Sequence, residues 1–167
     1  MRVAMIVGAL AVAVVGFTFA RSGNAQAGVA TLDESGKKHL VAVDDQGRAV
    51  AGYDTVAYFT EGEPTPGSEE HTITWRGATW QFASAENKAA FAKDPERYAP
   101  QYGGYCAWGV AAKNDLFPVD PEAWRVEDDK LYLNYNRDVQ KTWLEDVPGF
   151  IESGDANWPA LEESKAK

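Results

Sequence analysis

The stretch HTITWRGATWQFASAENKAAFAKDP, residues 71–95, decides the fold. Apolar and polar side chains alternate on both sides of Arg76-Gly77, which is typical of two half-buried strands joined by a tight turn. Ser84 then precedes a run of helix-forming residues, and Asp94-Pro95 ends that run. The segment therefore predicts a β-hairpin followed by a helix from Ala85 to Lys93.

Two further segments extend this unit along the chain. Upstream, Asp54 precedes a short run rich in aromatic residues and is suited to cap a short helix. Downstream, residues 124–126 and 131–133 flank Asp128-Asp129, which favours a second hairpin, and a helix is expected from Arg137 to Glu145. This order indicates a small single-domain α+β fold in which β-hairpins pack with short helices.

The composition requires a packed core and excludes several classes of protein. Of the 167 residues, 45% are hydrophobic and 12% aromatic, with six Trp, which is too many rings for a disordered chain. The formal net charge of −9 repels phosphate backbones, so we expect no nucleic-acid partner. The single cysteine excludes an internal disulfide framework and a multi-thiolate zinc site.

Residues 1–27 have the pattern of a secretory signal peptide. Arg2 gives a positive start, residues 3–20 carry no charge, and Ala25-Gln26-Ala27 fits the small-x-small rule for cleavage. We expect cleavage after Ala27 and export to the periplasm. The alternative is an uncleaved anchor, because the uncharged run approaches the length of a membrane span, and only then is a membrane a partner.

The remaining chain divides by composition. Residues 28–47 are polar and short of large apolar side chains, which predicts a flexible lead-in. One strand is expected within it at His39–Val43, where apolar residues of both parities occur. The packed domain is expected over 48–160. The last residues, 161–167, are expected to be a disordered tail.

Cys106 is the main candidate for chemistry. It follows Gly103-Gly104, which free the backbone for positive φ or for close approach to another group. A thiol among aromatic rings is a soft ligand for Cu(I), and a helix starting just after it would lower its pKa. A small buried structural residue is an equally open interpretation.

A single thiolate needs further ligands to hold a metal ion. We select Asp54 and His71 as co-ligands, because carboxylates and imidazoles are common metal ligands. Each also has a structural interpretation, Asp54 as a helix cap and His71 as an exposed strand residue. His39 is a weaker candidate that we expect at the surface. The spacing matches no paired metal motif, so a site would be assembled from distant segments or shared between two chains.

Several short motifs carry a resemblance to a known family. They are GYD at 52–54, VAYF at 56–59, GATWQFAS at 77–84, YGGYCA at 102–107, LYLNYN at 131–136 and DANWP at 155–159. On these residues the sequence resembles YHS domain-containing proteins, most closely their exported single-domain branch, over roughly residues 48–160. The resemblance implies a hairpin-plus-helix, treble-clef-like core and a link to copper or similar metals.

The resemblance also shows where this chain departs from the metal-linked members. Their suspected ligands are cysteines in Asp-Pro-Val-Cys and Phe-Cys-Ser segments. Here those segments read DTVA at 54–57 and FAS at 82–84, so both thiols are missing. The thiol present in this chain is that of Cys106 instead.

Three functions remain open from the sequence. The first is an exported metal-binding domain, copper first, acting through Cys106. The second is a small-ligand or protein-binding module with a buried structural Cys106, in which the Trp residues form the core or line a pocket for a flat or cationic ligand. The third is a thiol-dependent enzyme, which the absence of a resolving cysteine and of hydrolase or nucleotide-binding motifs disfavours.

Overall fold

The computed structural model describes residues 27–166, and the predicted signal peptide lies outside them apart from Ala27. The elements run in the order β1 Ala27–Leu32, β2 Lys38–Val43, η1 Val50–Gly52, α1 Ala57–Thr60, β3 Ser68–Trp75, β4 Ala78–Phe82, α2 Ala85–Lys93, α3 Pro95–Tyr98, η2 Gln101–Gly104, η3 Gly109–Lys113, β5 Asp120–Glu127, β6 Lys130–Asn134, α4 Arg137–Leu144 and α5 Val147–Lys165. Helices and hairpins are mixed along one small domain, which confirms the α+β prediction.

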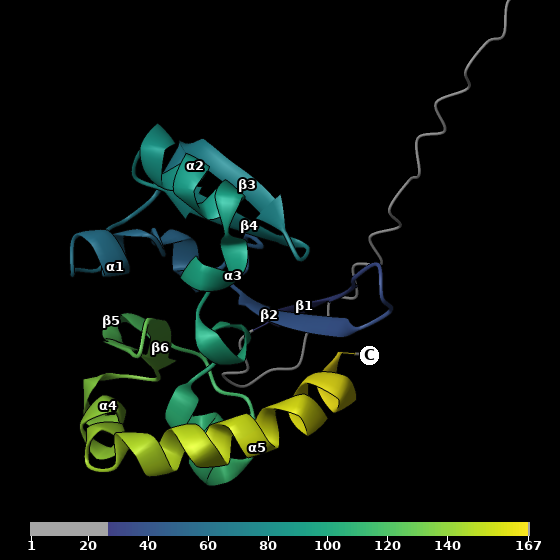
Figure 1. The fold of residues 1–167 in the computed structure, drawn as a ribbon, viewed down its shortest axis with the longest axis vertical. Helices are drawn as coiled ribbons and strands as arrows, with labels where there is room; N and C mark the ends of the chain where they lie inside the picture. Colours follow the sequence, from purple (N-terminus) through teal and green to yellow (C-terminus); the bar gives the residue numbers. More distant parts are fainter. Residues whose placement is uncertain (1–26, 167) are drawn as a thin grey trace, which may run out of the picture.

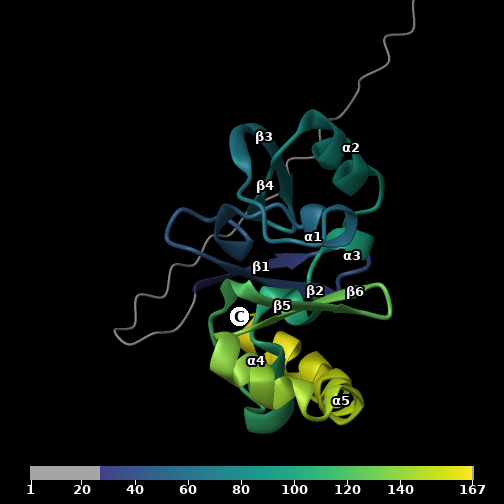
Figure 2. The same cartoon turned by 90° about the vertical axis from the view of Figure 1, so that its left-hand side faces the viewer.

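The strands pair as three antiparallel hairpins, β1–β2, β3–β4 and β5–β6. Figures 1 and 2 show β3, β4 and α2 at one end of the molecule, α4 and α5 at the other, and the β1–β2 hairpin between them. The hairpin-plus-helix unit β3–β4–α2 has the predicted order. The Ser84 side chain accepts a hydrogen bond from the N–H of Asn87, and α2 spans Ala85–Lys93 as the sequence predicts.

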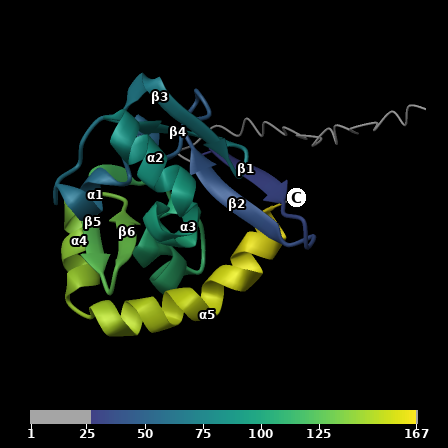
Figure 3. The ribbon, with the colours of Figure 1, turned by 45° about the horizontal axis from the view of Figure 1, so that its top comes forward.

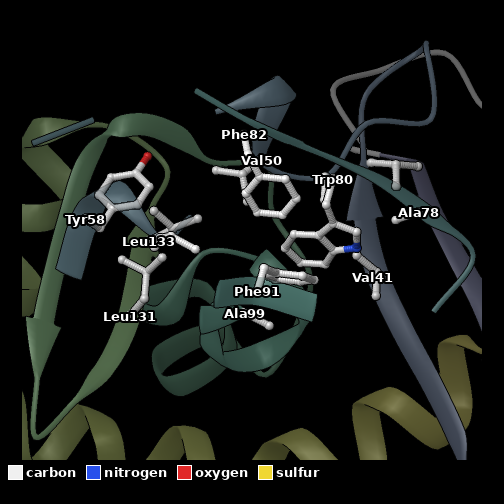
Figure 4. Close-up of a cluster of buried hydrophobic side chains, with 13 residues drawn as sticks. Val41, Val50, Tyr58, Ala78, Trp80, Phe82, Phe91, Ala99, Leu131 and Leu133 are labelled. Carbon is white, nitrogen blue, oxygen red and sulfur yellow. The ribbon is translucent and has the colours of Figure 1, made fainter. Parts of the chain in front are cut away.

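Two hydrophobic clusters share the strands β2 and β6. Val41 and Leu133 belong to the cluster around Trp80, Phe82 and Phe91, which Figure 4 shows beneath the β3–β4 hairpin. The neighbouring residues in β2 and β6, which point to the opposite faces, belong to a second cluster next to α4 and α5; they include Leu40, Ala42 and Tyr132. Both strands are therefore buried on two faces and link the two halves of the core.

The predicted flexible lead-in over 28–47 is wrong. Residues 27–43 form the β1–β2 hairpin, and Leu40 to Val43 are each at most 4% exposed. The strand expected at His39–Val43 is present as β2. The scarcity of large apolar side chains was misleading, because the small apolar residues of β2 are buried against two different clusters, one on each face of the strand.

The predicted chain end is also wrong. The helix α5 runs from Val147 to Lys165, and Leu161 and Ala166 are buried, so the tail expected over 161–167 is packed as far as it is described. Pro148 lies in the first turn of α5, where a missing N–H costs nothing, and the Asp146 side chain caps that turn by accepting from the N–H of Gly149. Figure 3 shows α5 passing the β5–β6 hairpin and reaching the end of β2.

Within the described part of the chain, no helix has the length and apolar character needed to cross a membrane.

Candidate functional site

Asp54 is fully buried in the hairpin-plus-helix unit. Its Oδ1 accepts hydrogen bonds from the backbone N–H groups of Val56, at 2.8 Å, and Ala57, at 3.3 Å. Its Oδ2 accepts from the N–H of Ala83, at 2.8 Å, and from Nδ2 of Asn87, at 2.7 Å. A carboxylate offers about four acceptor positions, and these four donors use them. Asp54 thus ties the start of α1 to the end of β4 and to α2, and keeps no oxygen for a metal ion.

Cys106 follows η2 and is closed in by its neighbours, with 1% of its surface exposed. Its Sγ accepts hydrogen bonds from the backbone N–H of Tyr135, at 3.2 Å, and of Gly109, at 3.4 Å. The thiol faces Oδ1 of the buried Asn134 at 3.8 Å. Among the described residues, its polar contacts are therefore amide groups rather than an imidazole or a carboxylate.

Burial raises the pKa of the Cys106 thiol, and the N–H groups of Gly109, Tyr135 and Trp108 lower it only in part. A helical turn does follow Cys106 and continues into the π-helix η3, as the sequence suggests. Its N–H groups do not produce the expected acidic thiol, because desolvation of the charged form outweighs them. An enclosed, neutral thiol is a poor nucleophile and a poor metal ligand.

The three residues predicted to share a metal do not converge. His71 is half-buried in β3, within the irregular stretch between Ser68 and Thr72. Across residues 27–166, no group of three or more His, Cys, Asp or Glu side chains is arranged to hold a metal ion. The described residues therefore do not fit a metal bound by Cys106, Asp54 and His71 together.

His39 is buried instead of exposed, which corrects the sequence-based expectation. Its Nε2 lies 3.0 Å from Oδ2 of Asp33, in the turn between β1 and β2. Its Nδ1 lies 3.8 Å from Oε1 of Glu162 in α5. His39 therefore links the first hairpin to the last helix, at the edge of a cleft that no single motif predicts.

This cleft has a volume of about 380 Å³ and lies between segments far apart in the sequence. One wall is β2, a second is the β3–β4 hairpin with Trp75, Arg76 and Trp80, and a third is the chain from α3 into η2. One face of α5 completes the lining. A concave site where several elements meet, lined by rings and a few polar groups, is typical of small-ligand binding.

The backbone is strained where η2 lines the cleft. Tyr102 has φ +55° and is followed by Gly103 and Gly104, also at positive φ. A side chain on Gly103 would overlap the carbonyl oxygen of Leu40 in β2, so the glycine allows η2 to lie directly on that strand. Tyr102 is one of seven described non-glycine residues at positive φ, and here this conformation turns the chain so that η2 rests on β2 and lines the cleft.

The face of α5 in the cleft carries Asp155, Trp158 and Glu162. Tyr102 is 5% exposed, and its hydroxyl donates to Oδ1 of Asp155 at 3.0 Å. Burial, and then the Asp155 carboxylate, raise the pKa of Tyr102 far above its usual value, so the phenol remains a donor. The half-buried Trp158 packs its ring against Tyr102 and Tyr105, with centroids 6.0 and 6.3 Å apart.

On the opposite wall, the Arg76 guanidinium lies over the Trp75 ring, 4.2 Å from its centroid. Its Nη2 also contacts Oε1 of Glu96 at 2.7 Å. A cation, an aromatic face and a carboxylate thus meet within the chain itself.

A second hollow, of about 390 Å³, lies between α1 and β5 and is lined by Tyr58, Phe59, Trp124 and the two arginines Arg97 and Arg125. Its Asp129 has a positive φ, and its buried Tyr58 hydroxyl donates to the carbonyl oxygen of Pro121 at 2.9 Å. We take the cleft as the candidate site because it joins four distant segments of the chain and carries the carboxylates of Asp155 and Glu162.

The comparisons identify one part of the chain. The family model described as YHS domain matches residues 56–102, which span α1, β3, β4, α2, α3 and the start of η2. Cys106 lies just beyond this match. No curated protein and no solved structure matches significantly.

Proposed function

This chain is a YHS domain-containing protein, and we propose that it acts as an exported binding module whose small ligand lies in the cleft between β2, η2 and α5. The cleft carries this proposal because it combines aromatic rings, fixed polar groups and strained backbone in one concave place. The YHS match supplies two of its walls, the β3–β4 hairpin and the chain leading into η2. The proposal of export rests on the sequence of residues 1–27.

Cys106 has a structural role in this proposal. Its sulfur takes two backbone N–H donors at the junction of η3 and β6, where a larger or apolar group would leave those donors unpaired. YHS domains are often linked to metal binding, so copper binding remains a prediction for this chain. Among the described residues no group of three or more His, Cys, Asp or Glu side chains is arranged to hold a metal ion, and Cys106 and Asp54 are both buried.

A thermal-shift screen of the purified protein tests the proposal. The panel contains small organic cations, neutral aromatic compounds, organic anions, Cu(I) and Zn(II). We expect at least one organic compound to raise the melting temperature, since ligands that bind only the folded state stabilise it. The shift should disappear in Trp158→Ala and persist in Trp108→Ala, which removes a half-buried Trp outside the cleft.

Two results would overturn the proposal. One is that no organic compound stabilises the protein. The other is stabilisation that survives Trp158→Ala. Stabilisation by Cu(I) alone, lost in Cys106→Ser, would establish the metal-binding function in its place.

A further inference from the structure

We infer that the ligand of the cleft is a small organic ammonium ion, held over the Trp158 ring by the carboxylates of Asp155 and Glu162. The inference rests on the proposed function, because it assigns the chemical class of ligand to the same cleft. It follows from the spacing of these three residues, from the hydrogen bonds of the two carboxylates and from the charges around them.

The three side chains form one stripe along α5. Asp155 and Trp158 are three residues apart, and Trp158 and Glu162 four apart, so consecutive members are neighbours on one helix face. All three line the cleft. Seven residues of helix correspond to a rise of roughly 10 Å, so Asp155 and Glu162 flank Trp158 on this face, about one turn to each side. An alkyl chain lying on the ring can place ammonium groups at both ends.

Each carboxylate is fixed through one oxygen and retains the other. Oδ1 of Asp155 accepts from the Tyr102 hydroxyl, and Oε1 of Glu162 accepts from the N–H of Leu40 at 3.2 Å. Within residues 27–166, the second oxygen of each has no hydrogen-bond partner, and neither carboxylate pairs with a Lys or Arg. Asp155 is therefore oriented by a hydroxyl, and Glu162 by the N–H of Leu40 and by the His39 imidazole, whose Nδ1 lies 3.8 Å from Oε1. The other oxygen of each carboxylate is left for a ligand.

On the facing wall, an aromatic ring and a carboxylate already bind a cation that belongs to the chain. Arg76 lies on Trp75 and is paired with Glu96, so that ring and that carboxylate have an internal cation. Trp158 has no cation over its ring among the described residues. The α5 stripe thus has the ring and carboxylates of a cation site without the cation.

The charges lining the cleft favour a cation by a small margin. Glu96, Asp155 and Glu162 are carboxylates, and Lys37 and Arg76 are cations. Because Arg76 and Glu96 pair with each other, Lys37 and the His39 imidazole face the carboxylates of Asp155 and Glu162. The other nitrogen of His39 lies 3.0 Å from Oδ2 of Asp33, a third carboxylate. Lys37 is exposed and reduces the attraction without cancelling it. The chain as a whole, at −9, attracts cations further.

Calorimetric titration with 1,5-diaminopentane at low salt and pH 8 tests this inference. The neutral control is 1,5-pentanediol, which has the same length and shape without charge. We expect the diamine to bind at least tenfold more tightly than the diol. Asp155→Asn and Glu162→Gln should each weaken diamine binding about three- to tenfold while keeping their internal acceptor oxygen. Lys37→Gln should strengthen it two- to threefold.

Matched controls separate the site from general attraction to an acidic protein. Glu152→Gln removes an exposed charge one turn earlier on α5, outside the cleft lining, and should leave the affinity unchanged. Mg²⁺ has the same charge without an apolar body and should bind no more tightly to wild type than to Trp158→Phe. A capped Gly-Lys-Gly peptide tests whether a protein lysine is preferred to a free amine.

The outcomes are distinguishable from those of the proposed function. Equal binding of diamine and diol, an equal loss in Glu152→Gln, or tighter binding of the peptide would overturn the inference. If the diamine fails while a neutral or anionic compound binds at Trp158, the ammonium assignment fails and the cleft remains the ligand site. If no organic compound binds at Trp158, the proposed function itself fails.

Discussion

Asp54 and Asp155 are both held by hydrogen-bond donors, yet they differ in how many acceptor positions remain. Asp54 is fully buried and receives four N–H groups. Asp155 is exposed and receives one hydroxyl among the described residues. The same contrast separates Cys106, whose sulfur is enclosed by amide groups, from Trp158, whose ring lines an open cleft. Two of the candidate residues chosen from the sequence, Asp54 and Cys106, are enclosed groups, whereas the groups left for a ligand lie on α5.

The largest expected effect concerns the saturated aspartate. Asp54→Ala leaves four donors without an acceptor, two of them on the buried residues Val56 and Ala57, and should lower the free energy of unfolding by about 3–5 kcal/mol, a large share of ordinary domain stability. Asp45→Ala, at an exposed position two residues before Gly47, should cost under about 0.5 kcal/mol. Urea unfolding followed by Trp fluorescence measures both. If both variants lowered the free energy of unfolding by a similar small amount, Asp54 would not be the saturated carboxylate described, and its contrast with Asp155 would fail.

The next prediction concerns the wall of the cleft. Gly103→Ala combines a strained positive φ with overlap on the Leu40 carbonyl, and should cost about 3 kcal/mol. Gly36→Ala has a similar positive φ but open space around the new methyl group, so only the strain of about 1–2 kcal/mol applies. Thermal unfolding of the two variants separates the cost of steric overlap from the cost of backbone strain. Equal costs would mean that η2 does not lie on β2 as described.

A third prediction tests the enclosed thiol. Cys106→Ala removes the acceptor for two backbone N–H groups and should cost about 2 kcal/mol, whereas Cys106→Ser replaces it and should cost about 1 kcal/mol. In the wild type, alkylation by iodoacetamide should proceed only as fast as the protein unfolds, because burial raises the thiol pKa and blocks access. Rapid alkylation of the folded protein near pH 8 would contradict the enclosed state.

How much of this could be predicted from the sequence depended on how local each signal was. The hairpin at 71–82 and the helix capped by Ser84 were predicted because turn, alternation and cap lie within a few residues. Of the β1–β2 hairpin only the strand at His39–Val43 was predicted; β1 and the burial of β2 were missed, because that burial requires both hydrophobic clusters to be formed. The cleft was missed because its walls come from four distant segments.

One signal for the cleft was present in the sequence. Asp155, Trp158 and Glu162 have the spacing of one helical face. The helical spacing was not used, because the last helix expected from the sequence ends at Glu145. Pro148 is tolerated in the first turn of α5, and Pro159 lies within a helix that packs against β2 and η3.

The smallest expected effect lies at the edge of the cleft. Hydrogen bonds from the Ser35 hydroxyl and the His39 ring hold the pKa of Asp33 well below its model-peptide value of 3.8. A lowered folded pKa gives stability that is present above pH 4 and lost as the pH falls below it. The melting temperature of the wild type should therefore drop more between pH 5 and pH 3 than that of Asp33→Asn. Identical drops would show that Asp33 is not held in this way.

The most direct test of the difference between the two regions is an assigned amide and indole N–H NMR spectrum recorded during titration with 1,5-diaminopentane. We predict that the indole N–H of Trp158 and the amides of Gly103 and Asp155 shift, while the amides of Gly109 and Tyr135 around Cys106 stay in place. Shifts at Gly109 and Tyr135 with an unmoved Trp158 indole would contradict the account.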